Sequence, residues 1–320
     1  MKPKIIMNTA DEMTIQKGFE KFIQRKKIAN LSEASFRYYN DVYKIMTEVI
    51  AETTPCVEIC ESHLFEFINY IRGRNPNIRD TSVNSYLRGI RAIFYFFMEE
   101  GYTPKFNIKL IKAEKTIRET YTTAELERLL KKPNIKACSF AEYRNWVIVC
   151  YLLGTGNRER TVCNVKIGDL DFDTHEIKLT ATKNKKQYII PMSRVLERTL
   201  SEYLEYRKGE AEDYLFCNIY GQQMKNDTLT SAIKRFNHSR GVVKTSIHLF
   251  RHTFAKNWIL NNGDIFRLQK LLGHSSIEIV KEYVNMFGAD LQKNFDVFNP
   301  LDNMEIMKRS RGAIQMNKDA

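Results

Sequence analysis

The chain has 320 residues, of which 43% are hydrophobic, and its 50 Lys and Arg against 38 Asp and Glu give a net charge of +12. The hydrophobic content excludes a mainly disordered protein. The length predicts two domains, at roughly 100 to 200 residues for each. The positive charge indicates a polyanionic partner, either nucleic acid or an anionic membrane surface.

The hydrophobicity of the chain predicts no membrane-spanning segment. The longest clearly apolar run, 146–153, has eight residues, whereas a spanning helix needs roughly 20. The N-terminal residues lack the apolar core of a signal peptide. The six cysteines include no C-x-x-C pair, which favours reduced, buried thiols over disulfides or a zinc site. We therefore predict a cytoplasmic protein without a membrane partner.

The first hundred residues have the apolar periodicity of helices. Residues 13–28, 61–71 and 81–99 carry apolar side chains at helical spacing. Ser32 is placed to cap a further helix that follows it. The pattern predicts a bundle of about four helices over residues 1–103.

A basic, weakly periodic stretch, 104–116, follows the bundle and is predicted to be an interdomain linker. Thr122 and Glu125 then have the spacing of a capping box, which predicts the start of a new helix. We place a second domain at residues 117–290 and a C-terminal tail at 291–320.

The second domain contains one segment with the period of a strand instead of a helix. Ile177 and Leu179 alternate with Lys178 and Thr180, the stretch 182–186 is polar, and 188–191 is apolar again. This pattern predicts a β-hairpin with a lysine-rich tip. The expected fold is therefore mainly α, with a helical bundle followed by an α-rich domain that holds a small antiparallel sheet.

Several residues of the second domain are suited to chemistry on a phosphodiester. His248 and Arg251 are three apart, so on a helix they lie within about 60° of each other on one face. Arginines can clamp the non-bridging oxygens and stabilise the charge of a five-coordinate transition state. The full set comprises two arginines, a lysine, two histidines and one nucleophile: Arg158, Lys183, His248, Arg251, His274 and Tyr283.

The order and spacing of these residues resemble the catalytic domain of the tyrosine recombinase (phage integrase) family. The family's T-G-x-R block corresponds to 155–158, its H-x-x-R block to 248–251 and its L-G-H block to 272–274, and Tyr283 follows at the family's spacing. The resemblance covers about residues 120–290. By its helix count, the helical bundle is similar to the family's core-binding domain.

The resemblance implies a role for each residue. Tyr283 attacks the scissile phosphate and forms a 3′-phosphotyrosyl link, which releases a 5′-hydroxyl. The two arginines, Arg158 and Arg251, bind the non-bridging oxygens, and Lys183 protonates the leaving oxygen. His248 acts as the general base for the tyrosine, while His274 donates a hydrogen bond to the phosphate. The energy of the cleaved phosphodiester bond is kept in the phosphotyrosyl link, so the resemblance implies neither a metal nor a nucleotide cofactor.

The sequence departs from the family pattern in two places. Arg160 and Thr161 stand where many members carry Ser and Glu, so Arg160 competes with Arg158 for the first arginine; the distance to Asp169 favours Arg158. The hairpin lysine is flanked by Thr and Asn instead of glycines. Its competitors are Lys185 and Lys186, and the distance back from Pro191 favours Lys183 as the acid.

The resemblance implies a site-specific recombinase that acts on duplex DNA as a tetramer, two protomers on each of two sites. We expect a role in the integration or excision of a mobile element or phage. The alternatives are an Xer-type resolvase of chromosome dimers, a type IB topoisomerase-like relaxing enzyme, and a DNA-binding module without catalysis. The tail at 291–320 could serve as an arm exchanged between subunits.

Overall fold

The structure is a computed structural model that describes residues 13–113, 119–179, 188–273, 281, 283 and 284. The chain forms two compact units, Met1–Thr116 and Ile117–Ala320. Each unit has a hydrophobic core of its own, so each is described separately.

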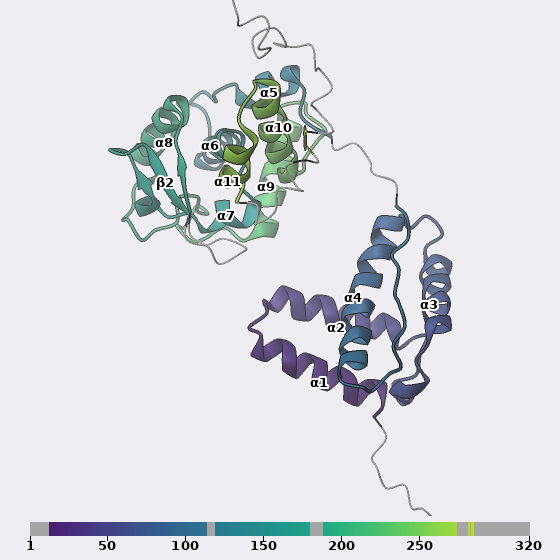
Figure 1. Ribbon diagram of the computed structural model, residues 1–320. Coiled ribbons are helices and arrows are strands. Elements are labelled where there is room, and N and C mark those ends of the chain that lie inside the picture. Colours follow the sequence, from purple (N-terminus) through teal and green to yellow (C-terminus); the bar gives the residue numbers. More distant parts are fainter. Residues whose placement is uncertain (1–12, 114–118, 180–187, 274–280, 282, 285–320) are drawn as a thin grey trace, which may run out of the picture. The chain divides into compact units, whose positions relative to one another are not determined.

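The first unit is a helical bundle, as the sequence predicts. Ser32 accepts a hydrogen bond from the backbone N–H of Ser35 at 3.3 Å, which confirms the predicted cap. The α-helices described in this unit are α1 (Ile15–Ile28), α2 (Glu33–Met46), α3 (Glu61–Arg74) and α4 (Asp80–Glu99), together with a short 3₁₀ turn η1 (Cys56–Glu58) (Figure 1).

Aromatic side chains fill much of the core of this bundle. Phe94 and Phe97 of α4 are fully buried, and Phe22 of α1 meets Phe96 edge to face at 5.6 Å between ring centroids. Phe19 of α1 stacks on Tyr43 of α2, with their centroids 3.8 Å apart. Such rings remove large apolar areas from water and dominate the energetics of a small core.

The chain that leaves the bundle is held against it. Asn84 of α4 is buried, and its amide donates to the carbonyl of Ile111 at 2.7 Å while its side-chain oxygen accepts from the N–H of Ile111 at 2.8 Å. Ile108 is also buried in the core of the bundle. Residues 104–113, the described part of the segment predicted to be a linker, therefore pack on the first unit.

The second unit contains the remaining described helices and all of the described strands. Thr122 accepts from the N–H of Glu125 at 3.3 Å and its own N–H donates to that carboxylate at 2.7 Å, which confirms the predicted capping box. Its elements are α5 (Thr123–Leu130), α6 (Phe140–Thr155), α7 (Glu159–Asn164), a 3₁₀ turn η2 (Ile167–Asp169), β1 (Leu170–Asp171), β2 (Glu176–Leu179), β3 (Tyr188–Pro191), α8 (Arg194–Arg207), α9 (Asn226–Ser239), α10 (Ile247–Leu260) and α11 (Ile265–Leu271).

Helix α6 forms the centre of this unit. Its residues from Tyr143 to Val149 are all buried, and it packs against α5, α8, α9 and α10. Figure 1 shows α6 between α8 and α10. The helix therefore lies inside the core, where the buried guanidinium of Arg144 is satisfied by the carbonyl of Cys217 and the side-chain oxygen of Asn145. The C-terminal end of α6 positions the candidate site.

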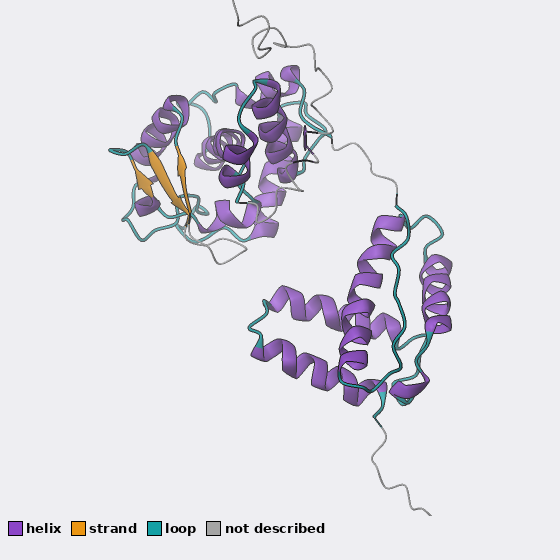
Figure 2. Cartoon of the chain, viewed as in Figure 1, coloured by secondary structure: helices purple, strands orange, loops and turns teal. Residues whose placement is uncertain are grey.

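The strands form an antiparallel sheet in the order β1-β2-β3, together at one edge of the second unit (Figure 2). Ile177 pairs with Ile190 and Leu179 pairs with Tyr188. The predicted hairpin is confirmed at β2 and β3, while β1 was not predicted because two residues carry no detectable alternation. The hairpin tip, 180–187, lies outside the described residues.

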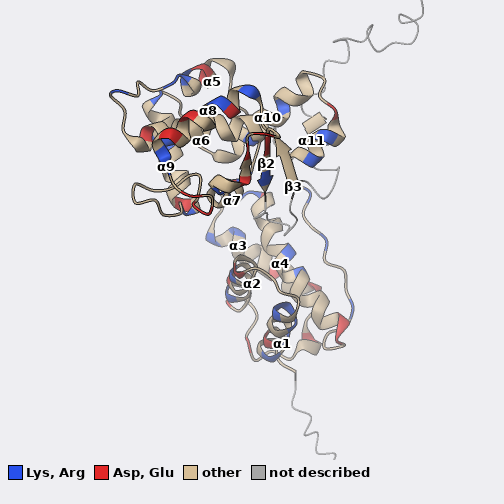
Figure 3. Cartoon of the chain, turned by 90° about the vertical axis from the view of Figure 1, so that its left-hand side faces the viewer, with Lys and Arg blue, Asp and Glu red and all other residues tan. Residues whose placement is uncertain are grey.

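Lys and Arg residues lie on helices of both units (Figure 3). Within the described ranges, no helix combines the length and the hydropathy that a bilayer-spanning helix needs. All six cysteines are described, and all are free thiols.

Replacing Asn84 with Asp tests whether its side chain anchors the outgoing chain. Asn84→Asp removes the donor to the carbonyl of Ile111 and places a carboxylate against it, at a cost of about 1 to 3 kcal/mol. Repulsion between the carboxylate and the carbonyl should push the segment away from α4 and break the bond of the Ile111 amide as well. That amide hydrogen should then exchange with solvent about tenfold faster or more, as measured by NMR or mass spectrometry.

The matched control is Asn107→Asp in the same segment. The exposed side-chain oxygen of Asn107 accepts a hydrogen bond from Tyr95 at 3.3 Å, and a carboxylate can accept that bond equally well. Equal exchange of the Ile111 amide in both variants would contradict the anchoring role of Asn84.

Candidate active site

The end of α6 determines where Arg158 lies. Gly156 caps the helix with φ 62° and ψ 19°, and its N–H donates to the carbonyl of Leu152. The buried side chain of Asn157 donates to the hydroxyl of Tyr151 at 3.0 Å. After this turn Arg158 caps α7, and its Nη1 donates to the carbonyl of Leu272 at 3.4 Å.

No side chain fits at the position of Gly156. A Cβ there would lie 2.7 Å from Phe254 Cδ1 and 2.9 Å from Leu272 Cδ2, both below van der Waals contact. The positive φ disfavours other residues as well. The glycine therefore allows α6 to end in close contact with α10 and with the segment that follows α11.

Helix α10 supplies Arg251, which is only 4% exposed. Its Nη1 donates to the carbonyl of Gly156 at 2.9 Å and its Nη2 donates to the carbonyl of Leu272 at 2.8 Å. The carbonyl of Leu272 thus accepts from both Arg158 and Arg251. Residues 93 positions apart in the sequence are joined at one backbone atom.

The two guanidinium groups repel each other. Burial, followed by the nearby charge of Arg158, lowers the pKa of Arg251 to about 10. The nearby side chains of Tyr283 and Tyr188 raise the pKa of Arg251 and so offset part of this lowering. The site is a largely desolvated concentration of positive charge, and an anion bound there would relieve the repulsion.

Tyr283 lies beside Arg251 within the same chain. The residue is 1% exposed and belongs to a small apolar cluster with Ala255, Leu268 and Leu272. Its hydroxyl lies 2.8 Å from Nδ1 of His252, and a hydrogen bond with Arg251 favours the charged form of that arginine. The phenol is therefore near its own arginines, but it is covered.

The structure brings three of the predicted residues together: Arg158, Arg251 and Tyr283. His248 shares the α10 face of Arg251 by helical spacing, but it is exposed. Lys183 and His274 lie outside the described residues. The competitor Arg160 is an exposed residue of α7, and it is Arg158 that meets Arg251 at Leu272.

Two residues of the site were not predicted from the sequence. His252 contacts the phenol, and its spacing of four from His248 was the available signal, since both lie on one helix face. Tyr188 begins β3, and its phenol is close enough to Arg158 and Arg251 that their charges act on its pKa, which burial raises. Nothing in its local sequence indicates that contact, because it depends on the path of the hairpin.

The sequence pattern of the phage integrase family matches residues 119–288, which is more than half of the chain. The chain belongs to the phage integrase family. Its members, the tyrosine recombinases, are enzymes that cleave and rejoin DNA, and this chain is an enzyme of that class.

Curated relatives extend the similarity beyond the catalytic domain. A tyrosine recombinase of Pseudothermotoga lettingae is 25% identical over 270 residues, covering 82% of this chain and 90% of the relative. The tyrosine recombinase XerD of Listeria monocytogenes is 24% identical over 292 residues, covering 87% and 95%. Each match covers more of this chain than the catalytic unit alone can supply, so each includes part of the helical unit as well.

Solved structures of the family share the fold. The Tn1549 transposon integrase in complex with circular intermediate DNA has a TM-score of 0.68 at 20% identity and covers 85% of this chain and 95% of its own. A lambda integrase dimer bound to a COC′ core site has a TM-score of 0.65 at 17% identity, with coverage of 83% and 97%. These matches confirm the predicted fold class.

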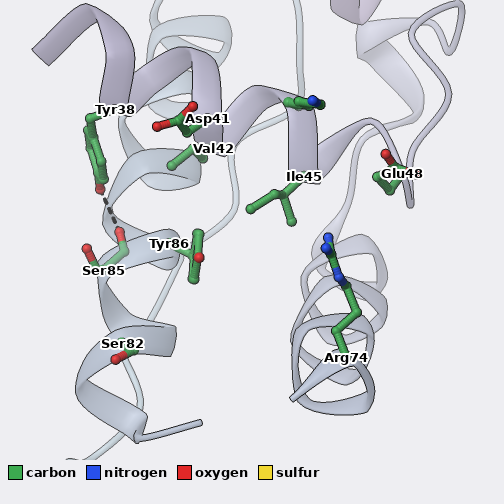
Figure 4. Close-up of a pocket in the computed structure, with 10 residues that line it drawn as sticks. Tyr38, Asp41, Val42, Ile45, Glu48, Arg74, Ser82, Ser85 and Tyr86 are labelled. Atoms are coloured by element: carbon green, nitrogen blue, oxygen red, sulfur yellow. Dashed lines mark hydrogen bonds between the residues drawn. The ribbon is translucent and has the colours of Figure 1, made fainter. Parts of the chain in front are cut away.

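A separate groove lies in the helical unit, with a volume of about 800 Å³. Figure 4 shows its side chains coming from α2, α3 and α4, with the hydroxyl of Tyr38 donating to the carbonyl of Ser85. The lining includes acidic Asp41 and Glu48 as well as basic Lys44 and Arg74. The groove holds none of the predicted catalytic residues, and we assign it no catalytic role.

Gly156→Ala should destabilise the catalytic unit by about 2 to 5 kcal/mol, because left-handed strain adds to overpacking against Phe254 and Leu272. The control is Gly221→Ala, since Gly221 has φ 79° but nothing within 4 Å of a Cβ. That change should cost only the backbone strain, about 1 to 2 kcal/mol. Thermal unfolding of both variants gives the comparison. Equal losses would show that close packing at Gly156 does not matter.

Proposed function

We propose that the chain is a site-specific recombinase that cuts and rejoins duplex DNA with Tyr283 as the nucleophile. The observation that carries this proposal is the convergence of three residues spread over 126 positions: Arg158 and Arg251 meet at the carbonyl of Leu272, and Tyr283 lies beside Arg251. A phenol next to two arginines matches the needs of attack on a phosphodiester.

The arginines bind the scissile phosphate. Two guanidinium forks can hold both non-bridging oxygens and stabilise the extra negative charge of the five-coordinate transition state. The burial of Arg251 strengthens this effect, because charges interact more strongly where water is excluded. The phosphate also offsets the repulsion between the arginines.

In the covalent step, Tyr283 Oη bonds to phosphorus and the bond from phosphorus to the 5′-oxygen breaks. The product is a 3′-phosphotyrosyl link, and Lys183 supplies the proton that the leaving 5′-oxygen takes up. His274 donates a hydrogen bond to the phosphate, and the resemblance assigns the proton of Tyr283 to His248. A 5′-hydroxyl from another strand then reverses the sequence and releases the enzyme.

Attack requires that Tyr283 be uncovered, since it is 1% exposed in the free protein. We propose that DNA binding displaces the residues that cover the phenol. A nucleophile that is covered without DNA would also be protected from reaction with other electrophiles.

We propose that both units bind duplex DNA and that the active assembly is a tetramer on two sites. The basic composition of the chain supports a DNA partner. The structural neighbours with the same fold include a lambda integrase tetramer bound to a Holliday junction.

The tail at 291–320, which lies outside the described residues, is our candidate for an exchanged arm. We propose that the enzyme acts in the cytoplasm, where a bacterial or phage DNA substrate would be found.

For the cellular role we propose the integration or excision of a mobile element, in line with the transposon integrase among the structural neighbours. The Xer-type alternative is favoured by the curated relatives. The chemistry is shared, so sequencing the DNA that becomes joined to the protein in cells decides between them. A topoisomerase-like enzyme would instead relax supercoils without a paired site.

Tyr283→Phe should abolish covalent adducts on a nicked suicide substrate while DNA binding stays within about threefold, because only the nucleophilic oxygen is lost. Gel electrophoresis under denaturing conditions measures the adduct, and a mobility shift measures binding. Tyr188→Phe is the matched control, since Tyr188 is another phenol close to both arginines. Adducts that persist in Tyr283→Phe would reject the nucleophile.

Lys183→Ala should slow cleavage by about 10² to 10⁴-fold, the usual contribution of a general acid. A substrate with sulfur in place of the 5′-bridging oxygen should restore the rate, because a thiolate leaves without protonation. Lys185→Ala, on the same hairpin tip, should show neither effect. A rescue seen with Lys185→Ala instead would move the acid to that residue.

A further inference from the structure

We propose that His252, and not His248, accepts the proton of Tyr283 and positions its phenol for attack; this inference rests on the proposed function. The observation behind it is the contact between Tyr283 Oη and His252 Nδ1 at 2.8 Å. His252 is thereby a catalytic residue, because it touches the reacting oxygen.

The contact has the geometry of a hydrogen bond between a phenol and an imidazole. The distance is normal for a hydroxyl donor, and the two rings are tilted by 50° with centroids 5.6 Å apart. A neutral imidazole with its proton on Nε2 accepts at Nδ1. His252 can therefore hold the phenol in one orientation and take its proton without any change of position.

The neighbouring residue on α10 completes the arrangement. Arg251 directly precedes His252 and hydrogen-bonds with the same tyrosine. Its positive charge stabilises the negative charge that develops on Oη as the proton leaves. A proton acceptor and a cation thus reach one oxygen from adjacent positions of one helix.

His248 is differently placed. It lies one turn before His252, about 6 Å along the helix axis, and it is exposed. No residue in the described part of the chain hydrogen-bonds with its imidazole. We therefore assign His248 to the DNA phosphate, which approaches from solvent, and His252 to the nucleophile.

Proton transfer and attack on phosphorus involve the same oxygen of Tyr283. The bond between Oη and its hydrogen breaks, and the proton passes to Nδ1 of His252. The electron pair left on Oη forms the bond to phosphorus, while the pair of the breaking bond leaves with the 5′-oxygen. During rejoining the tyrosine oxygen is the leaving group, and the His252 imidazolium returns the proton to it.

The test uses a more acidic phenol at position 283. In the full-length protein, Tyr283 is replaced by 2,3,5-trifluorotyrosine, which ionises far more readily than tyrosine and so needs no base. His252→Asn keeps a polar atom near the place of Nδ1 but cannot take up a proton. Single-turnover cleavage of the suicide substrate is measured for each combination.

With ordinary tyrosine, we expect His252→Asn to slow cleavage by about 10²-fold or more. With trifluorotyrosine, the difference between His252→Asn and the unsubstituted protein should shrink to less than about tenfold. The matched control is His248→Asn, whose defect should be the same with either phenol, because its lost contact is to the phosphate. A role of His252 in folding alone would not respond to the acidity of the phenol.

Three results would overturn the proposal: full cleavage activity in His252→Asn, a defect that trifluorotyrosine leaves unchanged, or rescue of His248→Asn in its place. If thermal unfolding shows that His252→Asn is unfolded, His252→Gln replaces it in the same comparison. The proposed function fails separately, through the absence of adducts from the unsubstituted protein or their persistence in Tyr283→Phe.

Discussion

The candidate site depends on the hydrogen bonds of Arg251 to the C-terminal ends of two helices. Gly156 caps α6 and Leu272 caps α11, and their carbonyls accept from the two terminal nitrogens of the guanidinium. Carbonyls at helix ends lack partners within the helix and carry the negative end of its dipole. They therefore compensate part of a positive charge that is nearly excluded from water.

These bonds also join the three motifs that the sequence analysis identified. The first block contributes Gly156 and Arg158, the second contributes Arg251, and the third contributes Leu272. The spacing of each block is explained by one local requirement: a left-handed turn, a helix face or a helix end. Because all three meet at one guanidinium, a shift in any of them moves the phosphate site relative to Tyr283.

The site is assembled against electrostatic repulsion. Arg158 and burial both disfavour the charge on Arg251, as its lowered pKa shows. Natural proteins accept such local destabilisation where function requires it. The large apolar core around α6 supplies the stability that allows it.

Much of the fold followed from local patterns. Helical periodicity and the caps at Ser32 and Thr122 predicted helices close to those observed, because those signals act within a few residues. The reciprocal bonds between Asn84 and Ile111 were not predictable, since they join positions 27 apart by tertiary packing. The contacts of His252 and Tyr188 at the site have the same origin: each depends on how distant elements meet, whereas motif spacing only identifies residue types.

The acceptors of Arg251 are main-chain oxygens, and this has a consequence for how such a site tolerates mutation. A substitution at position 272 changes a side chain but leaves the carbonyl in place, so the bond is lost only if the backbone itself is displaced. The anchoring of the guanidinium is therefore robust to drift in the surrounding sequence, and its vulnerability is concentrated at the turn where a side chain has no room.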